Sequence, residues 1–346
     1  MVVVAPMLLF AGGIALLLVG ADMLVKGAGS CARNLSISTR AVGLIVFAFG
    51  SSAPELVVNI HASIGAHEGI VFGSIIGSNV FSTLGVLGLL GLVVPLRVGS
   101  ALVRRQITFS LVVTLLLAVL CNDVFLFGLA ANRLSQLDGG VLLFGGFQLF
   151  MVYLLYLLTK AQSVEAGGYQ ARIPDIFGHP PSVEADDAPL VTAEVAVYGP
   201  GRTASMIAMA AIATVLGGYL VVENCARLAQ LLAIRQQVIA LTLIAVGASV
   251  PELLVSLLAA RRGHIDMAVA NIVGSNTFNI VFVLGASAVI YPAPFDASLN
   301  ADLLLLCAAT LGFRVLIGRR RAVQRWAAGA MIAAYAAYLG YVLWRG

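Results

Sequence analysis

The chain has 346 residues, of which 60% are hydrophobic and only 10% are charged, and its formal net charge is +4. A soluble domain averages about 25% charged residues, so this composition excludes an ordinary water-soluble globular protein. The sequence carries neither a Walker-type GxxxxGK motif nor cysteines at metal-ligand spacing, which argues against an ATP-driven pump and against a resident zinc or copper cofactor.

Apolar runs of about 20 residues or more predict ten transmembrane helices. The first five cover residues 7–25, 41–65, 69–95, 104–121 and 140–160, and the second five cover 204–222, 236–260, 266–292, 298–317 and 323–343. We therefore expect an all-α integral membrane protein. Residues 1–160 would form one five-helix half and residues 204–346 the other, joined by a flexible loop at 161–203.

The basic residues predict the orientation of these helices. With the N-terminus outside, only four of the 20 Lys and Arg residues fall on the outer side: Arg133, Arg227, Arg235 and Arg345. Cytoplasmic loops are generally rich in Lys and Arg, so this distribution favours ten spans. Both termini would lie outside, and the loop at 161–203 would lie in the cytoplasm.

Two blocks of sequence occur twice, 197 residues apart. AFGSSAPELVVN (48–59) matches AVGASVPELLVS (245–256), and GSIIGSNVFSTLGVLG (73–88) matches ANIVGSNTFNIVFVLG (270–285). Each copy contains five predicted spans, an odd number, so the second copy enters the membrane upside down. Inverted repeats of this kind are typical of secondary transporters, whose binding sites lie near the bilayer midplane between the repeats.

Each first block places a proline inside a predicted span. Pro54 and Pro251 have no N–H, so the carbonyl groups of Gly50 and Gly247 lose their helical donors. Free carbonyl groups are tolerated within the membrane only where they line a cavity or meet a ligand. We therefore expect both helices to be broken at a midplane binding site.

A glutamate follows each proline, and these two are the only acidic residues predicted to lie deep in the membrane. A carboxylate there costs roughly 2.5–3.5 kcal/mol, and the sequence offers no deep Lys or Arg as its partner. A protonated structural glutamate is the alternative for Glu55 and Glu252. Their equivalent positions in the two copies favour a cation site.

Hydroxyl groups complete an oxygen-rich set of candidate ligands. Ser52 and Ser249 lie three residues before each glutamate, and Ser78 and Ser275 lie 23 residues after it. Carboxylate, hydroxyl and carbonyl oxygens suit Ca²⁺, or Na⁺ at lower charge, rather than Zn²⁺ or Cu⁺. Each serine taken alone could equally donate a hydrogen bond to its own helix.

At these residues the chain resembles the cation/calcium exchanger superfamily. Its two inverted repeats each carry a G-[ST]-S-x-P-E block and a later G-S-N block, here GSSAPE (50–55) with GSN (77–79), and GASVPE (247–252) with GSN (274–276). The proline makes the chain similar to the prokaryotic sodium/calcium exchangers, because the calcium/proton branch typically reads GNxxE. The resemblance thus implies the inner membrane of a prokaryote.

The resemblance also implies roles for single residues. Glu55 and Glu252 would bind Ca²⁺ and Na⁺ in turn, and the four serines would line flanking Na⁺ sites. The remaining implied ligands are the carbonyl groups of Ala48 and Ala245, and Ser51 with Ala248 near the Ca²⁺ site. Ser82 and Asn279 stand where relatives carry Asn or Asp, and a neutral residue at 279 disfavours a potassium requirement.

The expected function is antiport of Ca²⁺ against Na⁺, with helices 1 and 6 sliding against the rest as the resemblance implies. The bilayer and the transported ions are the expected partners, and we expect neither an enzyme nor a nucleic-acid-binding protein. Three alternatives remain open: a Ca²⁺/H⁺ antiporter that uses the same glutamates, a cation channel, and a structural or receptor-like membrane protein.

Overall fold

The structure is a computed structural model, and it describes residues 3–34, 52–98, 101–122, 132–149, 151–152, 198–261, 263, 265–320 and 322–345. The spans predicted at 41–65 and 140–160 are therefore described only in part. The loop predicted at 161–203 lies almost entirely outside the described residues. Its predicted end is too late, because a helix already begins at Pro200.

Helices make up nearly all of the described chain. In the first half they are α1 (Val4–Asn34), α3 (Ala53–Ile64), α4 (Glu68–Val80), the π-helix η1 (Phe81–Val86), α5 (Leu87–Val93), α6 (Ala101–Leu120), α8 (Gln136–Gly140) and the π-helix η2 (Val141–Gly146). In the second half they are α10 (Pro200–Leu232), α11 (Gln236–Ile239), the π-helix η4 (Ala240–Ile244), α12 (Ala245–Ala248), α13 (Val250–Arg261), α14 (Ile265–Phe278), the π-helix η5 (Asn279–Leu284), α15 (Gly285–Ile290), the 3₁₀-helix η6 (Ala297–Leu299), α16 (Asn300–Arg320) and α17 (Arg325–Arg345).

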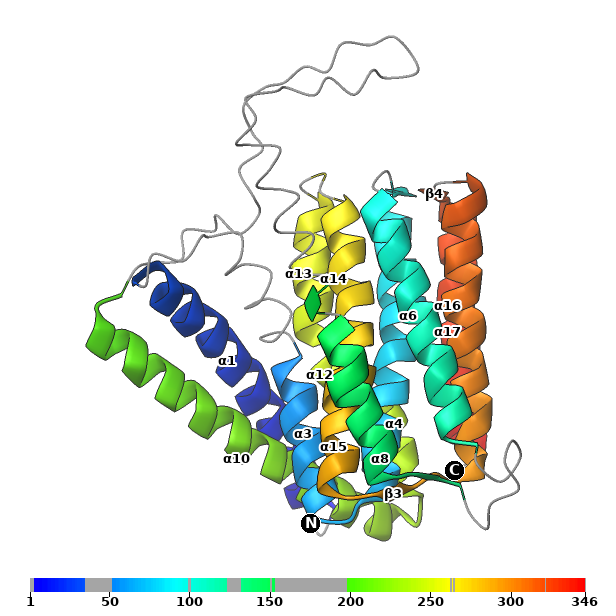
Figure 1. Cartoon of the computed structure of the whole chain (residues 1–346). Helices are drawn as coiled ribbons and strands as arrows, with labels where there is room; N and C mark the ends of the chain where they lie inside the picture. The colour runs from blue at the N-terminus through cyan, green and yellow to red at the C-terminus, as the bar shows by residue number, and fades with distance from the viewer. Residues whose placement is uncertain are drawn as a thin grey trace.

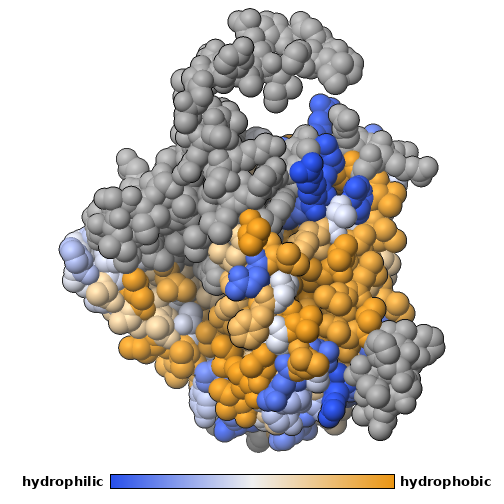
Figure 2. All heavy atoms as spheres, viewed as in Figure 1, coloured by the Kyte–Doolittle hydropathy of each residue, from blue (hydrophilic) through white to orange (hydrophobic). Residues whose placement is uncertain are grey.

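Eight helices in the described part are long and apolar enough to cross a membrane, and they match eight of the ten predicted spans. The other two predicted spans include α3 and the α8–η2 segment, whose neighbouring residues are not described. Figure 2 shows apolar side chains over the middle of the visible face, with hydrophilic ones toward its upper and lower ends. The prediction of an all-helical membrane protein is confirmed.

The first helices of the two halves, α1 and α10, lie side by side and run in opposite directions, as inverted repeats require (Figure 1). Successive glycines of α1, Gly13 and Gly20, face residues of falling number on α10, Gly217 and Thr214. A Cβ atom added to Gly13 would lie 2.9 Å from the carbonyl oxygen of Gly217. The two backbones therefore touch, and a larger side chain at this crossing would push the helices apart.

The helices that contain the predicted spans at 7–25 and 204–222 are longer than the spans themselves. α1 has 31 residues and α10 has 33, or about 50 Å at 1.5 Å per residue, against a hydrocarbon core of about 30 Å. Residues such as Lys26 and Glu223 lower the local hydropathy without interrupting the helices. The excess length agrees with the steep tilt of both helices relative to the others (Figure 1).

The continuous helices at Glu68–Val93 and Ile265–Ile290 form the centre of the molecule. In each, 83% of the most apolar 18-residue window is buried, against 28% for Arg325–Arg345 at the periphery. They carry the two GSN blocks, and each follows a shorter helix, α3 or α13, that carries a glutamate. The core of the protein is therefore built from the two repeated hairpins.

Two short strand pairs connect the halves near opposite ends of the molecule (Figure 1). β1 (Leu96–Arg97) pairs antiparallel with β4 (Ala322–Val323), with Leu96 opposite Val323. β2 (Arg133–Leu134) pairs antiparallel with β3 (Ala293–Pro294), with Leu134 opposite Ala293. Each pair joins one strand of the first half to one of the second.

Candidate cation-binding site

The helix that carries the second glutamate is broken where the sequence predicts. α12 ends at Ala248, α13 begins at Val250, and Ser249 between them has φ −87° and ψ 7°. In the first half Ser52 has nearly the same conformation, φ −92° and ψ 9°, directly before α3. The prolines two residues later suit this conformation in both halves, because they cannot donate to the carbonyl group four residues back.

Glu55 lies at a meeting point of both halves. Its side chain is 1% exposed, and its Oε1 atom accepts hydrogen bonds from the hydroxyl groups of Ser78 at 3.3 Å and Ser249 at 3.4 Å. The two hydroxyl oxygens lie 2.7 Å apart. The structure thus brings together three of the predicted site residues, from α3, from α4 and from the break between α12 and α13.

Small residues on α4 allow this close approach. A Cβ atom added to Gly77 would lie 2.6 Å from the carbonyl oxygen of Leu241, and one added to Gly73 would lie 2.8 Å from the Cβ atom of Ala240. These glycines are four residues apart, so they form one helix face against η4. Ser78, the next residue after Gly77, is thereby placed beside the second half.

The second half of the site is arranged differently. Glu252 is also 1% exposed. The hydroxyl group of Ser275 donates a hydrogen bond to the carbonyl oxygen of Ile272 at 3.1 Å, within its own helix. The hydroxyl group of Ser52 has no hydrogen-bond partner among the described residues. No hydrogen bond joins Ser275 to Ser52 among the described residues, whereas the hydroxyl oxygens of Ser78 and Ser249 lie 2.7 Å apart.

A network of side-chain amides on the two GSN-bearing helices connects the two halves. Asn79 donates to the main-chain oxygen of its repeat equivalent Asn276 at 3.1 Å, and Asn276 donates to the hydroxyl group of Thr83 at 3.0 Å. Asn279 donates to the side-chain oxygen of Asn79 at 3.3 Å. Sequence reasoning did not single out Asn79 and Asn276, although both end a GSN block at the repeat offset.

The remaining predicted ligands have different surroundings. The carbonyl oxygen of Ala245 accepts hydrogen bonds from Ser249, at 2.9 Å from its hydroxyl group and 3.3 Å from its N–H. Ser82 is buried at the start of η1, and Ala248 is buried at the end of α12. Ala48 and Ser51 lie outside the described residues.

Several buried oxygens in this region lack a hydrogen-bond donor from the described residues: Ser52 Oγ, Glu55 Oε2, Asn276 Oδ1 and Asn279 Oδ1. A buried polar atom without a partner is unfavourable, so this surplus of acceptors suits a positively charged guest. Hydroxyl, carboxylate and amide oxygens are the ligands that hard cations prefer. The described residues contain no group of three or more His, Cys, Asp or Glu at metal-binding positions, so main-chain and hydroxyl oxygens would have to complete the shell.

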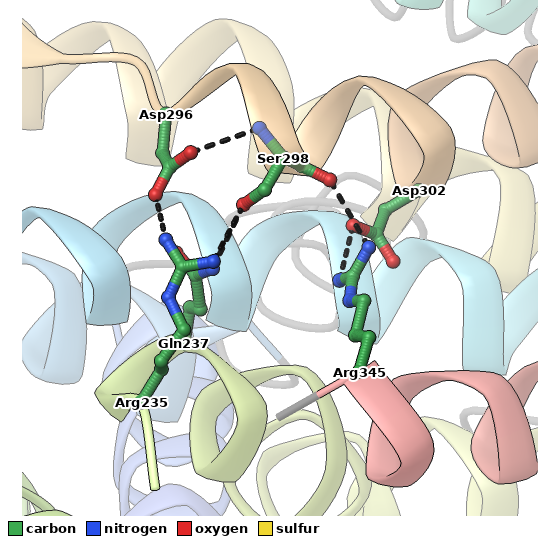
Figure 3. A network of polar contacts seen from close by, with 6 residues as sticks. All are labelled: Arg235, Gln237, Asp296, Ser298, Asp302 and Arg345. Carbon is green, nitrogen blue, oxygen red and sulfur yellow. Dashed lines mark hydrogen bonds and ion pairs between the residues drawn. The ribbon is translucent and has the colours of Figure 1, made fainter.

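A second polar network lies at the end of the molecule that we predict to be outside (Figure 3). Arg235 forms an ion pair with Asp296 and donates to the hydroxyl group of Ser298 at 3.1 Å. Partial burial alone would raise the pKa of Asp296. Hydrogen bonds from the N–H and hydroxyl groups of Ser298, together with the charge of Arg235, outweigh burial and hold this pKa below its ordinary value. The ion pair therefore remains charged at neutral pH.

The same network contains a buried carboxylate that sequence reasoning missed. Asp302 is fully buried, and Arg345 donates to it at 2.5 Å and to the main-chain oxygen of Ser298 at 3.0 Å. Asp302 lies two residues after the start of α16, near a helix end, and so was not among the acidic residues predicted to lie deep in the membrane. Its counter-charge comes from α17, and no sequence pattern marks the two as partners.

Comparison with known proteins supports the assignment of this chain to a transporter family. The family model described as sodium/calcium exchanger protein matches residues 5–161 and 203–344. The putative antiporter CaxA of Alkalimonas amylolytica is 34% identical over 94% of this chain and 95% of its own length. The inner membrane protein YrbG of Escherichia coli is 30% identical over 96% of this chain and 93% of its own length.

The structural comparison agrees with the family match. A structure of the sodium-calcium exchanger NCX_Mj soaked with Na⁺ and Sr²⁺ is 27% identical, covers 98% of this chain and 99% of its own chain, and has a TM-score of 0.60. Its similarity therefore extends over both repeated halves. Taken with the inverted hairpins and their buried glutamates, these matches show that the chain belongs to the sodium/calcium exchanger protein family.

Proposed function

We propose that this protein is a secondary active antiporter that exchanges Ca²⁺ for Na⁺ across the membrane by alternating access. The observation that carries the proposal is the buried carboxylate of Glu55, held by hydroxyl groups from both halves, with its second oxygen free of described partners. Glu252 occupies the equivalent position in the other repeat. The names of CaxA and NCX_Mj agree with exchange of this kind.

Charge balance explains why such a site would couple the two ions. Glu55 and Glu252 together carry two negative charges when ionised, and Ca²⁺ or Na⁺ ions can balance them. A buried carboxylate without a balancing charge is strongly unfavourable, so the empty site would cross the membrane poorly. Competition of the two ions for the same carboxylates would then enforce exchange.

The other proposed ligands follow the sequence prediction. Ser52, Ser78, Ser249 and Ser275 would line flanking Na⁺ sites, with the carbonyl group of Ala245 next to Ser249. Ala48 and Ser51 would supply oxygens from the segment before α3, and Ser82 and Asn279 would lie nearby without adding charge. Neutral residues at 82 and 279 support a site that does not require K⁺.

The tilted pair α1 and α10 supports an alternating-access mechanism. Backbone contact at Gly13 and Gly217 holds these two helices together, and their remaining contacts to the carboxylate-bearing helices are mainly with α3. We propose that they move as one unit against the central hairpins and expose the site to each side in turn. Both termini would be outside and the loop at 161–203 cytoplasmic, in an inner membrane like that named for YrbG.

Transport by purified protein in liposomes tests the proposal. Liposomes loaded with Na⁺ and diluted into Na⁺-free buffer should take up radioactive Ca²⁺, and collapsing the Na⁺ gradient should stop the uptake. Glu55→Gln should reduce uptake by about a hundredfold or more. The substitution removes the negative partner of a buried pair formed by carboxylate and cation, and such a loss costs roughly 3–5 kcal/mol. Glu223→Gln, near the far end of α10, is the matched control and should transport normally.

Two results would contradict parts of this proposal, the first the identity of the exchanged ions and the second the role of Glu55. Uptake driven by a pH gradient in the absence of Na⁺ would identify a Ca²⁺/H⁺ antiporter that uses the same carboxylates. Full uptake by Glu55→Gln would remove this residue from the site.

A further inference from the structure

A buried hydrogen bond joins α3 to α4 one helical turn away from Glu55. The side-chain amide of Asn59 donates to the hydroxyl group of Ser74 at 2.9 Å, and both residues are essentially inaccessible to solvent. The same amide lies 2.9 Å from the main-chain oxygen of Glu55 itself. Ser74 in turn donates to the main-chain oxygen of Val71, so its hydroxyl group acts as donor and acceptor at once.

The second hairpin contains the same hydrogen bond with the two residue types exchanged. Asn271 on α14 donates to the hydroxyl group of Ser256 on α13 at 3.0 Å. At the repeat offset of 197 residues, Ser256 corresponds to Asn59, and Asn271 corresponds to Ser74. Both hairpins therefore have one amide–hydroxyl bridge at the same place, but the amide comes from the glutamate helix in one and from the GSN helix in the other.

The bridge is in register with the candidate ligands. Glu55 and Asn59 are four residues apart on α3, and Ser74 and Ser78 are four residues apart on α4, so each pair lies on one helix face. In an antiparallel hairpin, the Asn59–Ser74 bond is thus the next rung after the Glu55–Ser78 bond.

The second hairpin shows that the amide–hydroxyl bridge does not depend on a hydrogen bond between the serine of the GSN block and the glutamate. Its bridge between Asn271 and Ser256 is present although Ser275 donates to its own helix and not across the hairpin. The bridge is therefore the feature that both hairpins share, whatever the arrangement of the serine that follows a turn later.

We infer that Asn59 with Ser74, and Asn271 with Ser256, are positioning pairs. Each pair fixes how the two helices of its hairpin are aligned along their axes, and so holds the glutamate carboxylate level with the other candidate cation ligands. This inference rests on the proposed function of the glutamates. The proline just before each glutamate cannot donate a helical hydrogen bond, and the bridge provides a hydrogen bond one helical turn after the glutamate. Asn59 also leaves its buried Oδ1 atom without a described partner, a cost that an apolar residue would not carry.

The exchange of residue types between the repeats provides the test. Asn59→Ser leaves two short hydroxyl side chains that cannot span the gap, and Ser74→Asn places two amides where one fits. The double variant Asn59→Ser/Ser74→Asn recreates the arrangement of the second hairpin. In proteoliposomes, each single variant should raise the Ca²⁺ concentration for half-maximal exchange by about three- to twentyfold, the range of measured hydrogen bonds between membrane helices. The double variant should return to within about twofold of the original protein.

Two further variants separate positioning from general packing. Gln106→Leu removes another buried side-chain hydrogen bond to α14, at the main-chain oxygen of Ala270, that does not bridge a hairpin. It should lower the melting temperature at most, with an unchanged half-saturating Ca²⁺ concentration. The mirror pair Ser256→Asn and Asn271→Ser should repeat the loss and rescue in the second hairpin.

The outcomes distinguish this inference from the proposed function. Single variants that match the original protein in Ca²⁺ half-saturation, or a double variant no better than its parents, would overturn the positioning role. An original protein that shows no exchange of Ca²⁺ for Na⁺ would overturn the proposed function instead. In that case a Ca²⁺-dependent rise in melting temperature, lost in the single variants and regained in the double variant, would still support the positioning pairs.

Discussion

The hydroxyl group of Ser249 has more oxygen atoms within hydrogen-bond distance than it can donate to. Its oxygen lies 2.9 Å from the carbonyl oxygen of Ala245, 3.4 Å from Glu55 Oε1 and 2.7 Å from the hydroxyl oxygen of Ser78. A serine has one proton and two lone pairs, so it donates to only one of these oxygens at a time. When it donates to Ala245, Ser78 supplies the only other proton, which goes either to Ser249 at 2.7 Å or to the carboxylate at 3.3 Å, but not to both at once.

Removing this hydroxyl group should weaken cation binding. Ser249→Ala should raise the half-saturating Ca²⁺ concentration by about tenfold or more, because a hydrogen bond to a charged group contributes roughly 1.5–3 kcal/mol. Ser30→Ala is the matched control, since Ser30 is equally buried but bonds to Thr203 and Tyr198 between α1 and α10. Equal effects of both substitutions on Ca²⁺ half-saturation would show that Ser249 has no special part in the site.

At the residue scale, the sequence predicts the composition of the candidate site better than its connections. The repeat offset and the rarity of deep acidic residues are enough to select Glu55 and Glu252. They do not reveal that Ser275 bonds within its own helix, because a serine satisfies a nearby carbonyl group as readily as a distant carboxylate. The bridge between Asn59 and Ser74 was also missed, since the repeat equivalents differ in type and a search for matching letters passes over them.

At the scale of elements, α1 and α10 depend on the absence of side chains at their crossing. A Cβ atom at Gly13 would lie 2.9 Å from the carbonyl oxygen of Gly217 and 3.0 Å from the Cβ atom of Leu220, distances that real side chains do not tolerate. A Cβ atom at the adjacent Gly12 would meet nothing within 4 Å. Neighbouring glycines of the same helix thus have opposite surroundings.

These two glycines give a direct test of the helix pair. Gly12→Ala should be neutral or stabilising by up to about 1 kcal/mol, because alanine favours the helix. Gly13→Ala should destabilise the protein by about 1–3 kcal/mol, since the helices must separate to admit the methyl group. Thermal unfolding in detergent would measure both. A Gly13→Ala protein that melts at or above the temperature of Gly12→Ala would contradict the close crossing.

Hydropathy predicts where helices cross the membrane but not where they end. It places eight spans correctly in the described part, yet it does not reveal that α1 and α10 continue past those spans through Lys26 and Glu223. It also does not reveal that Asp302, near the start of α16, is buried, because its partner on α17 lies 43 residues away in the sequence. In both cases the reason is the same, because the hydropathy of a segment carries no information about the contacts that another helix makes with it.

At the scale of the whole molecule, inversion of the repeat follows from an odd number of spans, and the antiparallel contact of α1 with α10 agrees with it. The absolute orientation in the membrane rests on the charge distribution alone. α10 runs through the molecule from Pro200 to Leu232, and both Gly199, directly before the helix, and Leu232 are exposed. Its two ends therefore report on opposite sides.

Cysteine labelling at these ends tests the orientation. In a variant whose four native cysteines are replaced, Gly199→Cys should react with a membrane-impermeant thiol reagent only from the cytoplasmic side, and Leu232→Cys only from the outside. The positive-inside distribution of the whole chain supports this result, because only four of its 20 Lys and Arg residues fall on the predicted outer side. The reverse labelling pattern would invert the whole assignment, including the cytoplasmic position of the loop at 161–203.

The ion pair between Asp302 and Arg345 has a consequence for biosynthesis. The ribosome makes Asp302 43 residues before its partner, so α16 is complete while the counter-charge of its buried carboxylate does not yet exist. Membrane insertion of α16 alone would leave that carboxylate uncompensated in a low-dielectric environment. The arrangement therefore favours delivery of α16 and α17 from the translocon as one hairpin, with the contact between arginine and carboxylate forming once α17 has been made.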